Sequence, residues 1–89
     1  MRDPGLIKRP PRFDVAYQCA IVDDEGNERD VRVTDISREG CKVITDRPLR
    51  IGEHVVIRLA SQGDQAAKVR WSMGGEAGLA FAAPLPLED

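Results

Sequence analysis

Residues 13–33, FDVAYQCAIVDDEGNERDVRV, decide the fold. Apolar side chains occupy every second position of the first half: Val15, Tyr17, Cys19 and Ile21. Residues 23–27, DDEGN, have the composition of a tight turn, and Val31 and Val33 then alternate with polar neighbours. A period of two is typical of a strand with one buried face, so the stretch predicts two antiparallel strands joined as a hairpin.

The same alternation returns four more times along the chain, in Cys41-Val43, Val55-Ile57-Leu59, Ala67-Val69-Trp71 and Leu79-Phe81. Short polar or glycine-containing segments separate these runs, and no window has helical periodicity. Six strands with one apolar face remove their exposed edges most economically by closing on themselves. The sequence therefore predicts an all-β fold, a small six-stranded antiparallel β-barrel. Strand parity predicts that the rings of Tyr17, Trp71 and Phe81 point inward.

The chain of 89 residues has room for one domain with a thin core, so a ligand is expected to bind at the surface. We expect residues 1–12 to form a flexible basic arm and residues 13–83 to form the barrel. Residues 84–89 form a C-terminal tail, and its Pro-Leu-Pro-Leu segment is expected to plug one end of the barrel.

Charge is distributed unevenly. The whole chain carries 13 Lys+Arg against 15 Asp+Glu, a net charge of −2. Residues 1–12 carry four cations against one carboxylate, a local charge of +3. No apolar run is long enough to span a membrane, and the N-terminus lacks the apolar core of a secretory signal, so we expect a cytoplasmic protein without membrane insertion. In that compartment Cys19 and Cys41 are expected to be small buried thiols rather than a disulfide.

Three kinds of functional site are disfavoured. Asp35, Ser37 and His54 formally complete a hydrolase triad, but no nucleophile-elbow motif surrounds the serine, and we expect no catalytic residues. Cys19, Cys41 and His54 lack the short ligand spacings of zinc sites, and we expect no metal. Because the rings are expected to face the core, no stacking platform for single-stranded nucleic acid is expected either.

The segment after the second strand carries the clearest chemical signal: Asp35, Ser37 and Gly40 in a D-x-S-x-x-G pattern. The acidic and hydroxyl side chains lie on one side of an extended chain, and the glycine permits a positive φ or a close backbone approach. Arginines on the neighbouring arm can fork onto phosphate or the guanine edge. Together these features suit an anionic guanine nucleotide. The pattern also has a structural explanation, in which Asp or Ser caps a tight turn.

The order of these features resembles the PilZ domain family from about Lys8 to Phe81. The order is basic arm, strand, hairpin, D-x-S-x-x-G, Pro48-Leu49-x-x-Gly52, a Val/Ile strand, Val69-Arg70-Trp71 and Gly78-Leu79-Ala80-Phe81. The resemblance implies a six-stranded bacterial barrel that binds cyclic di-GMP through R-x-x-x-R before the first strand and [DN]-x-S-x-x-G after the second. By this carry-over Lys8, Arg9, Arg12, Asp35, Ser37 and Gly40 are the expected ligand-binding residues. Lys8 stands where the family has its first arginine.

The resemblance implies a receptor and not an enzyme. Cyclic di-GMP is its ligand and no cofactor is expected. The arm is expected to become ordered around the ligand and to present a new surface to an unidentified effector protein. The alternative is a degenerate barrel that binds no nucleotide and acts as a protein-interaction adaptor. The sequence leaves open the oligomeric state, for which Val22, Ile44 and Val56 are outward-facing apolar candidates.

Overall fold

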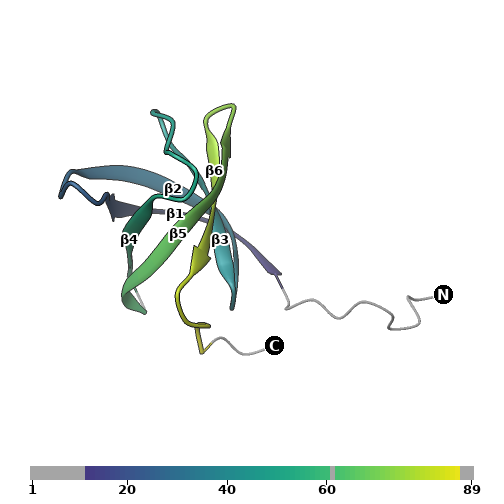
Figure 1. Cartoon of the computed structure of the whole chain (residues 1–89). Coiled ribbons are helices and arrows are strands. Elements are labelled where there is room, and N and C mark those ends of the chain that lie inside the picture. The colour runs from purple at the N-terminus through teal and green to yellow at the C-terminus, as the bar shows by residue number, and fades with distance from the viewer. Residues whose placement is uncertain (1–11, 61, 87–89) are drawn as a thin grey trace, which may run out of the picture.

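The computed structural model describes residues 12–60 and 62–86, with the side chains of residues 12–14 and 17 left aside. Its six strands are β1 (Arg12–Val22), β2 (Glu28–Ser37), β3 (Gly40–Ile44), β4 (His54–Leu59), β5 (Gly63–Met73) and β6 (Glu76–Phe81). All neighbouring strands are antiparallel, and they form a closed barrel in the order β1-β2-β3-β6-β5-β4 (Figure 1). The predicted all-β barrel is confirmed. The described residues contain no helix, and so none that is long and apolar enough to cross a membrane.

The core follows the period-two pattern of the sequence. The largest fully buried side chains come from different strands around the barrel and from the segment after β6: Ile21, Val33, Val43, Ile57, Val69 and Leu85. Val15 and Cys19 of β1 are half-buried and pack against this core. Alternation decides the inner face because successive side chains of a strand point to opposite sides of the sheet.

Leu85 closes one end of the barrel, as the sequence predicted for its segment. Its side chain is 1% exposed, and its N–H donates a 2.9 Å hydrogen bond to the carbonyl of Arg38 in the β2–β3 turn. The flanking Pro84 and Pro86 are exposed. A single leucine therefore covers the core where β2 turns into β3.

The opposite end is built by the β5–β6 turn and the long β3–β4 loop, which rise together in Figure 1. Gly74 and Gly75 make the tight turn with positive φ values of 62° and 81°, a conformation that glycine adopts without strain. The carbonyl of Gly75 accepts a hydrogen bond from Thr45 N–H at 2.9 Å. Further along the loop, Leu49 N–H donates to the Ser72 hydroxyl at 3.1 Å. These two hydrogen bonds attach the β3–β4 loop to the β5–β6 turn and to β5.

One expectation for the core is wrong. Trp71 was expected to point inward with Val69, but its side chain lies on the outer surface and is 37% exposed. The pairing of β5 with β6 advances from Val69↔Leu79 to Trp71↔Gly78, so two steps on β5 match one step on β6. Arg70 is the extra residue of a β-bulge, and a bulge reverses the parity of everything that follows it.

Candidate functional site

The residues of the D-x-S-x-x-G pattern line an open pocket of about 540 Å³ on the outside of the barrel. The pocket spans the end of β2, the first half of β3, β6 and the bulged part of β5. Its lining includes carboxylates, cations, one aromatic ring and a floor of small residues, contributed by Asp35, Ser37, Gly40, Lys42, Arg70, Trp71, Glu76, Gly78 and Ala80. This mixture of carboxylates, cations, a hydroxyl and a ring can offer hydrogen bonds, ionic contacts and a stacking surface to a polar ligand.

Asp35 and Ser37 both belong to strand β2, although they were expected in the turn that follows it. Only residues 38 and 39 lie between β2 and β3. Asp35 is half-buried. In the strand register it stands opposite Asp14 of β1 and Lys42 of β3. The rigid sheet on both sides fixes the direction of its carboxylate better than a loop would.

Ser37 is 7% exposed, and its hydroxyl is engaged within its own turn. The hydroxyl donates to the Gly40 carbonyl at 3.4 Å and accepts from the Glu39 N–H at 3.2 Å. This is the capping role that small hydroxyl residues take in turns. Ser37 therefore shapes the pocket wall through the turn as well as lining it.

Gly40 is required by strand packing. Its φ is not positive, and a Cβ added there would collide with the backbone carbonyl oxygen of Leu79 on β6. The close backbone approach expected at this position is present, and the positive φ is not. Because Gly40 has no side chain, the backbones of β3 and β6 can lie close together, and no side chain from this position fills the pocket.

Trp71 forms one side of the pocket. Its indole lies over Gly78, where an added Cβ would meet the ring carbons Cε2 and Cδ1 at 2.6 and 2.7 Å. The ring therefore lies across β6 and lines the same pocket as Asp35. The expectation that no exposed ring remains for stacking is wrong for Trp71, because the bulge at Arg70 turns it outward.

Sequence reasoning missed Arg70 and Trp71 as members of this pocket. Strict alternation along β5 would place Trp71 in the core and Arg70 on the solvent-facing side. Gly78 was the available signal, since a glycine inside a strand often marks a bulge or a ring lying over the backbone. Arg32, Arg58 and Lys68 are also exposed on the outside of the barrel.

The last residue of the predicted basic arm is part of the barrel sheet. Arg12 opens β1, and its backbone pairs with Ser37 of β2. Lys8 and Arg9 lie outside the described residues, as do the side chains of Arg12, Phe13 and Tyr17. The backbone pairing brings the end of the R-x-x-x-R region next to the end of the D-x-S segment.

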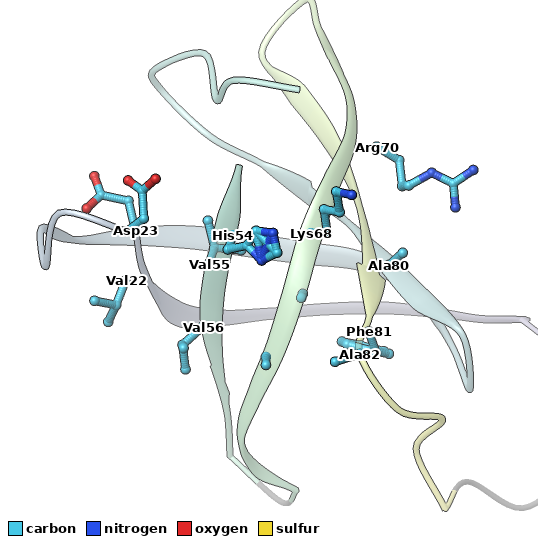
Figure 2. A pocket seen from close by; sticks show the side chains of 13 residues that line it. Val22, Asp23, His54, Val55, Val56, Lys68, Arg70, Ala80, Phe81 and Ala82 are labelled. Atoms are coloured by element: carbon cyan, nitrogen blue, oxygen red, sulfur yellow. The ribbon is translucent and has the colours of Figure 1, made fainter. Parts of the chain in front are cut away.

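A larger open groove of about 690 Å³ lies on the neighbouring outer face, over β4, β5 and the end of β6 (Figure 2). Its walls are mainly valine and alanine, with Asp23 at one end and Arg70 at the other. The two hollows share Arg70 and Ala80. Polar and charged side chains make up a larger share of the lining of the smaller hollow than of the larger one.

The disfavoured catalytic and zinc constellations are not brought together. His54 is exposed at the start of β4 and lines the larger groove, whereas Asp35, Ser37 and Cys41 line the smaller pocket. Cys41 is buried, and both cysteines are free thiols. Burial, with smaller contributions from Cys19 and Asp35, raises the pKa of the Cys41 thiol from 9.0 to about 12.

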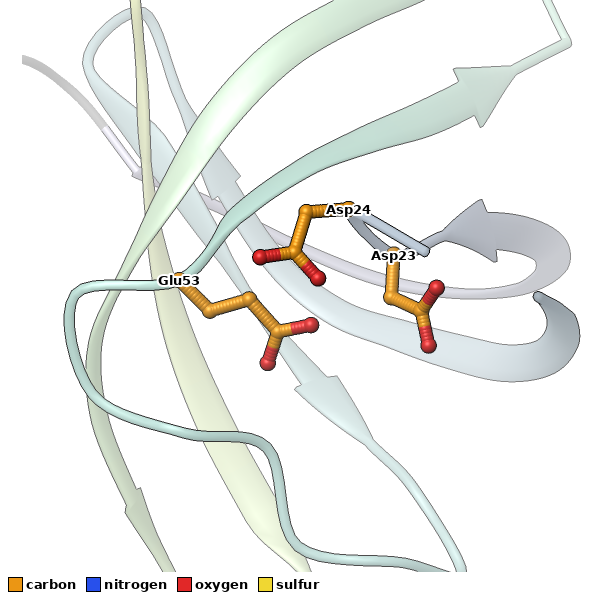
Figure 3. A group of neighbouring side chains, drawn as sticks. All are labelled: Asp23, Asp24 and Glu53. Atoms are coloured by element: carbon orange, nitrogen blue, oxygen red, sulfur yellow. The ribbon is translucent and has the colours of Figure 1, made fainter. Parts of the chain in front are cut away.

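Three carboxylates, of Asp23 and Asp24 in the β1–β2 turn and of Glu53 in the β3–β4 loop, have oxygens within 4.8 Å of one another (Figure 3). Asp23 accepts backbone N–H bonds of 2.9 Å from Glu25 and Asn27. The Asn27 N–H is the main cause that lowers the pKa of Asp23, and the Glu25 N–H and Arg29 act in the same direction. Each carboxylate of the cluster has a partner in the protein: Arg29 lies 3.8 Å from Asp23, Arg50 lies 4.0 Å from Asp24, and Glu53 accepts the Arg50 backbone N–H at 3.1 Å.

The comparison with known families decides the classification. The PilZ domain family matches residues 7–89, nearly the whole chain. The chain belongs to the PilZ domain family. A comparison with curated proteins found no match. PilZ domains are known as cyclic di-GMP-binding domains, and degenerate forms exist in the family. In this PilZ domain the D-x-S-x-x-G residues and an outward Trp71 line one open pocket, and the backbone of Arg12 pairs with Ser37, one of the lining residues.

Proposed function

We propose that this PilZ domain is a cytoplasmic receptor that binds cyclic di-GMP in the pocket beside Trp71 and signals the bound state to a partner protein. One observation carries the proposal: Asp35, Ser37 and Gly40 line the same 540 Å³ pocket as Trp71 and Arg70. The motif residues that the family uses are thus combined with a ring and a guanidinium that the motif does not include.

The donor set matches a guanine nucleotide. A carboxylate such as that of Asp35 accepts hydrogen bonds from the N–H groups of a guanine edge. The exposed indole of Trp71 offers a flat face on which a base stacks, with a gain of about 1–3 kcal/mol per base. Arg70, exposed and next to the ring, supplies a guanidinium for a phosphate or for a second base plane.

The arm supplies the remaining cations in this proposal. Arg12 pairs with Ser37 through the backbone, and Arg9 and Lys8 precede it by three and four residues in the sequence. Lys8 and Arg9 then contribute positive charge against a dianionic ligand. Ordering of the arm around the ligand is the output that a partner protein reads.

A second candidate is the degenerate, non-binding adaptor. The observation that favours it is that two motif residues have a structural purpose without any ligand. The Ser37 hydroxyl closes its own turn, and Gly40 is required by the Leu79 carbonyl. Retention of these residues is therefore compatible with a barrel that keeps the shape of the site but not its ligand.

Isothermal titration of the full chain with cyclic di-GMP, with GTP and cyclic di-AMP as controls, separates the two. Selective binding at micromolar concentration or tighter supports the receptor. Absence of heat at high protein concentration overturns it in favour of the adaptor. A Lys8→Arg variant refines the answer, since it restores the planar fork that lysine lacks and is expected to increase affinity if the arm engages the ligand.

A further inference from the structure

The larger groove over β4 and β5 contains a row of short apolar side chains that crosses the strands. Val22 of β1 pairs with Val56 of β4, and Val56 pairs with Ala66 of β5. Just after β6, the Ala82 N–H donates a hydrogen bond to the Ala66 carbonyl at 2.8 Å. All four residues line the groove. We call Val22, Val56, Ala66 and Ala82 the apolar row.

The apolar row lies on the outside of the barrel. Its two alanines are exposed and its two valines are half-buried, whereas Val55 and Ala67, beside them in sequence, are buried in the core. The strand pleat thus turns the row outward. Single exposed apolar residues need no explanation, but contiguous ones in a surface hollow mark an interaction site.

Two cations lie along one side of the apolar row. In the neighbouring row of the sheet, Lys68 of β5 pairs with His54 of β4 and with Ala80 of β6. Arg70 follows on β5, and Figure 2 shows it beyond Lys68, away from Val56. Both cationic side chains are exposed, and no ion pair joins either of them to a carboxylate in the described part of the chain. They are available to an anionic partner.

Other charges around the groove are compensated within the protein. The carboxylates that line the groove and the arginine in the row on its other side each lie within 4.0 Å of opposite charge: Asp23 of Arg29, Asp24 of Arg50, and Arg58 of Glu28 and Asp64. These exposed pairs add little stability, but their charges cancel locally. The uncompensated charge beside the apolar row is therefore positive, although the whole chain carries a net charge of −2.

The groove favours a partner that binds through side chains. Val56 and Ala66 are hydrogen-bonded or paired on both sides, so the floor offers no free strand edge to which a peptide could add. An amphipathic helix needs no such edge, because it lays its apolar face into a groove. The chain's own basic arm, with a local charge of +3, would meet Lys68 and Arg70 with like charge.

We propose that the groove binds an acidic amphipathic helix of the partner protein. Apolar side chains of the helix cover the apolar row, and carboxylates along one flank of the helix meet Lys68 and Arg70. Arg70 and Ala80 also line the smaller pocket, so a helix bound here adjoins the proposed nucleotide site. The proposal rests on the partner that the proposed function requires, and it does not require bound nucleotide.

Fluorescence polarisation of labelled synthetic helices, with the full chain and no nucleotide, tests the proposal. Peptides of about 16 residues, long enough to form a helix, carry leucine, phenylalanine or methionine on one face and either glutamate or lysine along one flank. At least one glutamate peptide is expected to bind at micromolar concentration, and its lysine counterpart roughly tenfold more weakly or worse. Equal binding of the two, or no binding of any glutamate peptide, overturns the proposal.

Matched substitutions locate the contact. Ala66→Glu and Lys68→Glu are each expected to weaken binding of the glutamate peptide by roughly tenfold or more. Ala60→Glu and Arg32→Glu make the same charge changes at exposed positions outside the groove, and both are expected to bind as the wild type does. Circular dichroism verifies that each variant is folded. Binding that survives both Ala66→Glu and Lys68→Glu places the peptide elsewhere and overturns the proposal.

Cyclic di-GMP titration of Ala66→Glu separates this proposal from the receptor proposal. The variant is expected to bind nucleotide as the wild type does, since Ala66 does not line the smaller pocket. A wild-type protein that binds the peptide but no nucleotide overturns the receptor and leaves the groove proposal standing.

Two other occupants have their own outcomes. Self-association in sedimentation velocity that Ala66→Glu abolishes would show that a second copy covers the groove. Binding to vesicles of anionic phospholipid that Lys68→Glu abolishes, without binding of any peptide, would assign the groove to a membrane surface. Either result overturns the proposal.

Discussion

The indole of Trp71 on β5 lies directly over Gly78 on β6, in the space that a Cβ atom of any other residue would occupy. The β-bulge at Arg70 turns the ring outward, and the glycine opposite allows it to lie flat on the sheet. This pair therefore determines whether the pocket has an aromatic side.

Gly78→Ala is expected to displace the Trp71 ring. The added methyl group overlaps ring atoms, and overpacking of this kind costs about 1–3 kcal/mol. Urea unfolding measures the loss, and the fluorescence of Trp71, the single tryptophan, reports the change in its surroundings. The same substitution in a Trp71→Ala background is the control. An equal cost in both backgrounds would show that the ring is not the obstacle.

Gly40→Ala is expected to destabilise the barrel more than Ser37→Ala. A methyl group at Gly40 meets the backbone oxygen of Leu79, which cannot move without disturbing β6, at a cost of about 1–3 kcal/mol or more. Ser37→Ala removes hydrogen bonds of 3.2 and 3.4 Å, for which about 1 kcal/mol is expected. Urea midpoints of the two variants provide the comparison, and the opposite ranking would contradict the packing role of Gly40.

Trp71→Ala is expected to weaken cyclic di-GMP binding by roughly 5- to 150-fold, the equivalent of about 1–3 kcal/mol of stacking on one base. Trp71→Phe retains a ring and is expected to recover part of this loss. Titration calorimetry measures both variants. Unchanged affinity in Trp71→Ala would remove the ring from the binding site and leave the rest of the pocket to be tested.

Asp35→Ala and Arg12→Ala test the two motif regions that meet at the pocket. Loss of one hydrogen-bonded charge contact costs about 1–3 kcal/mol, so each variant is expected to bind cyclic di-GMP roughly 5- to 150-fold more weakly. Thermal melting separates binding from folding. An Asp35→Ala protein that binds normally but melts earlier would show that Asp35 stabilises the barrel and does not contact guanine.

Cys41 is expected to make stability fall at alkaline pH. Its thiol has a pKa of about 12 in the folded protein, against 9.0 for the ordinary thiol, so between these values the unfolded chain is ionised and the folded one is not. Rising pH then favours unfolding, by about 1.4 kcal/mol per pH unit for one such group. Urea unfolding from about pH 8 to about pH 10.5 measures the slope. Cys41→Ala should flatten it, and an equally steep slope in that variant would assign the effect to other groups.

The strands and most of the core were predictable from local sequence. Alternation in residues 13–33 and in Val55-Ile57-Leu59 identifies both strand and inner face, because the pleat alone decides where each side chain points. The aspartate-rich turn before β2 was predictable for the same reason, since Asp23 caps it through its own near neighbours. Six amphipathic strands in so short a chain then leave barrel closure as the economical way to remove sheet edges.

The composition of the pocket was only partly predictable. Asp35, Ser37 and Gly40 form a recognisable pattern because they are close in sequence. The backbone of Arg12 pairs with Ser37 only because an irregularity between Asp14 and Tyr17 shifts the β1–β2 register. Trp71 and Arg70 come from β5, more than thirty residues away. Their membership depends on the closed strand order, which places β6 between β3 and β5.

The sequence by itself determined the strands, their buried faces and the family motif, since these depend on neighbours along the chain. Only the tertiary structure decided the direction of Trp71 and the requirement for glycine at position 40. Ala67, Val69 and Trp71 look like one continuous inner face, and the bulge at Arg70 appears only when β5 is paired with β6. A register shift is a relation between two strands, so no pattern within one of them encodes it.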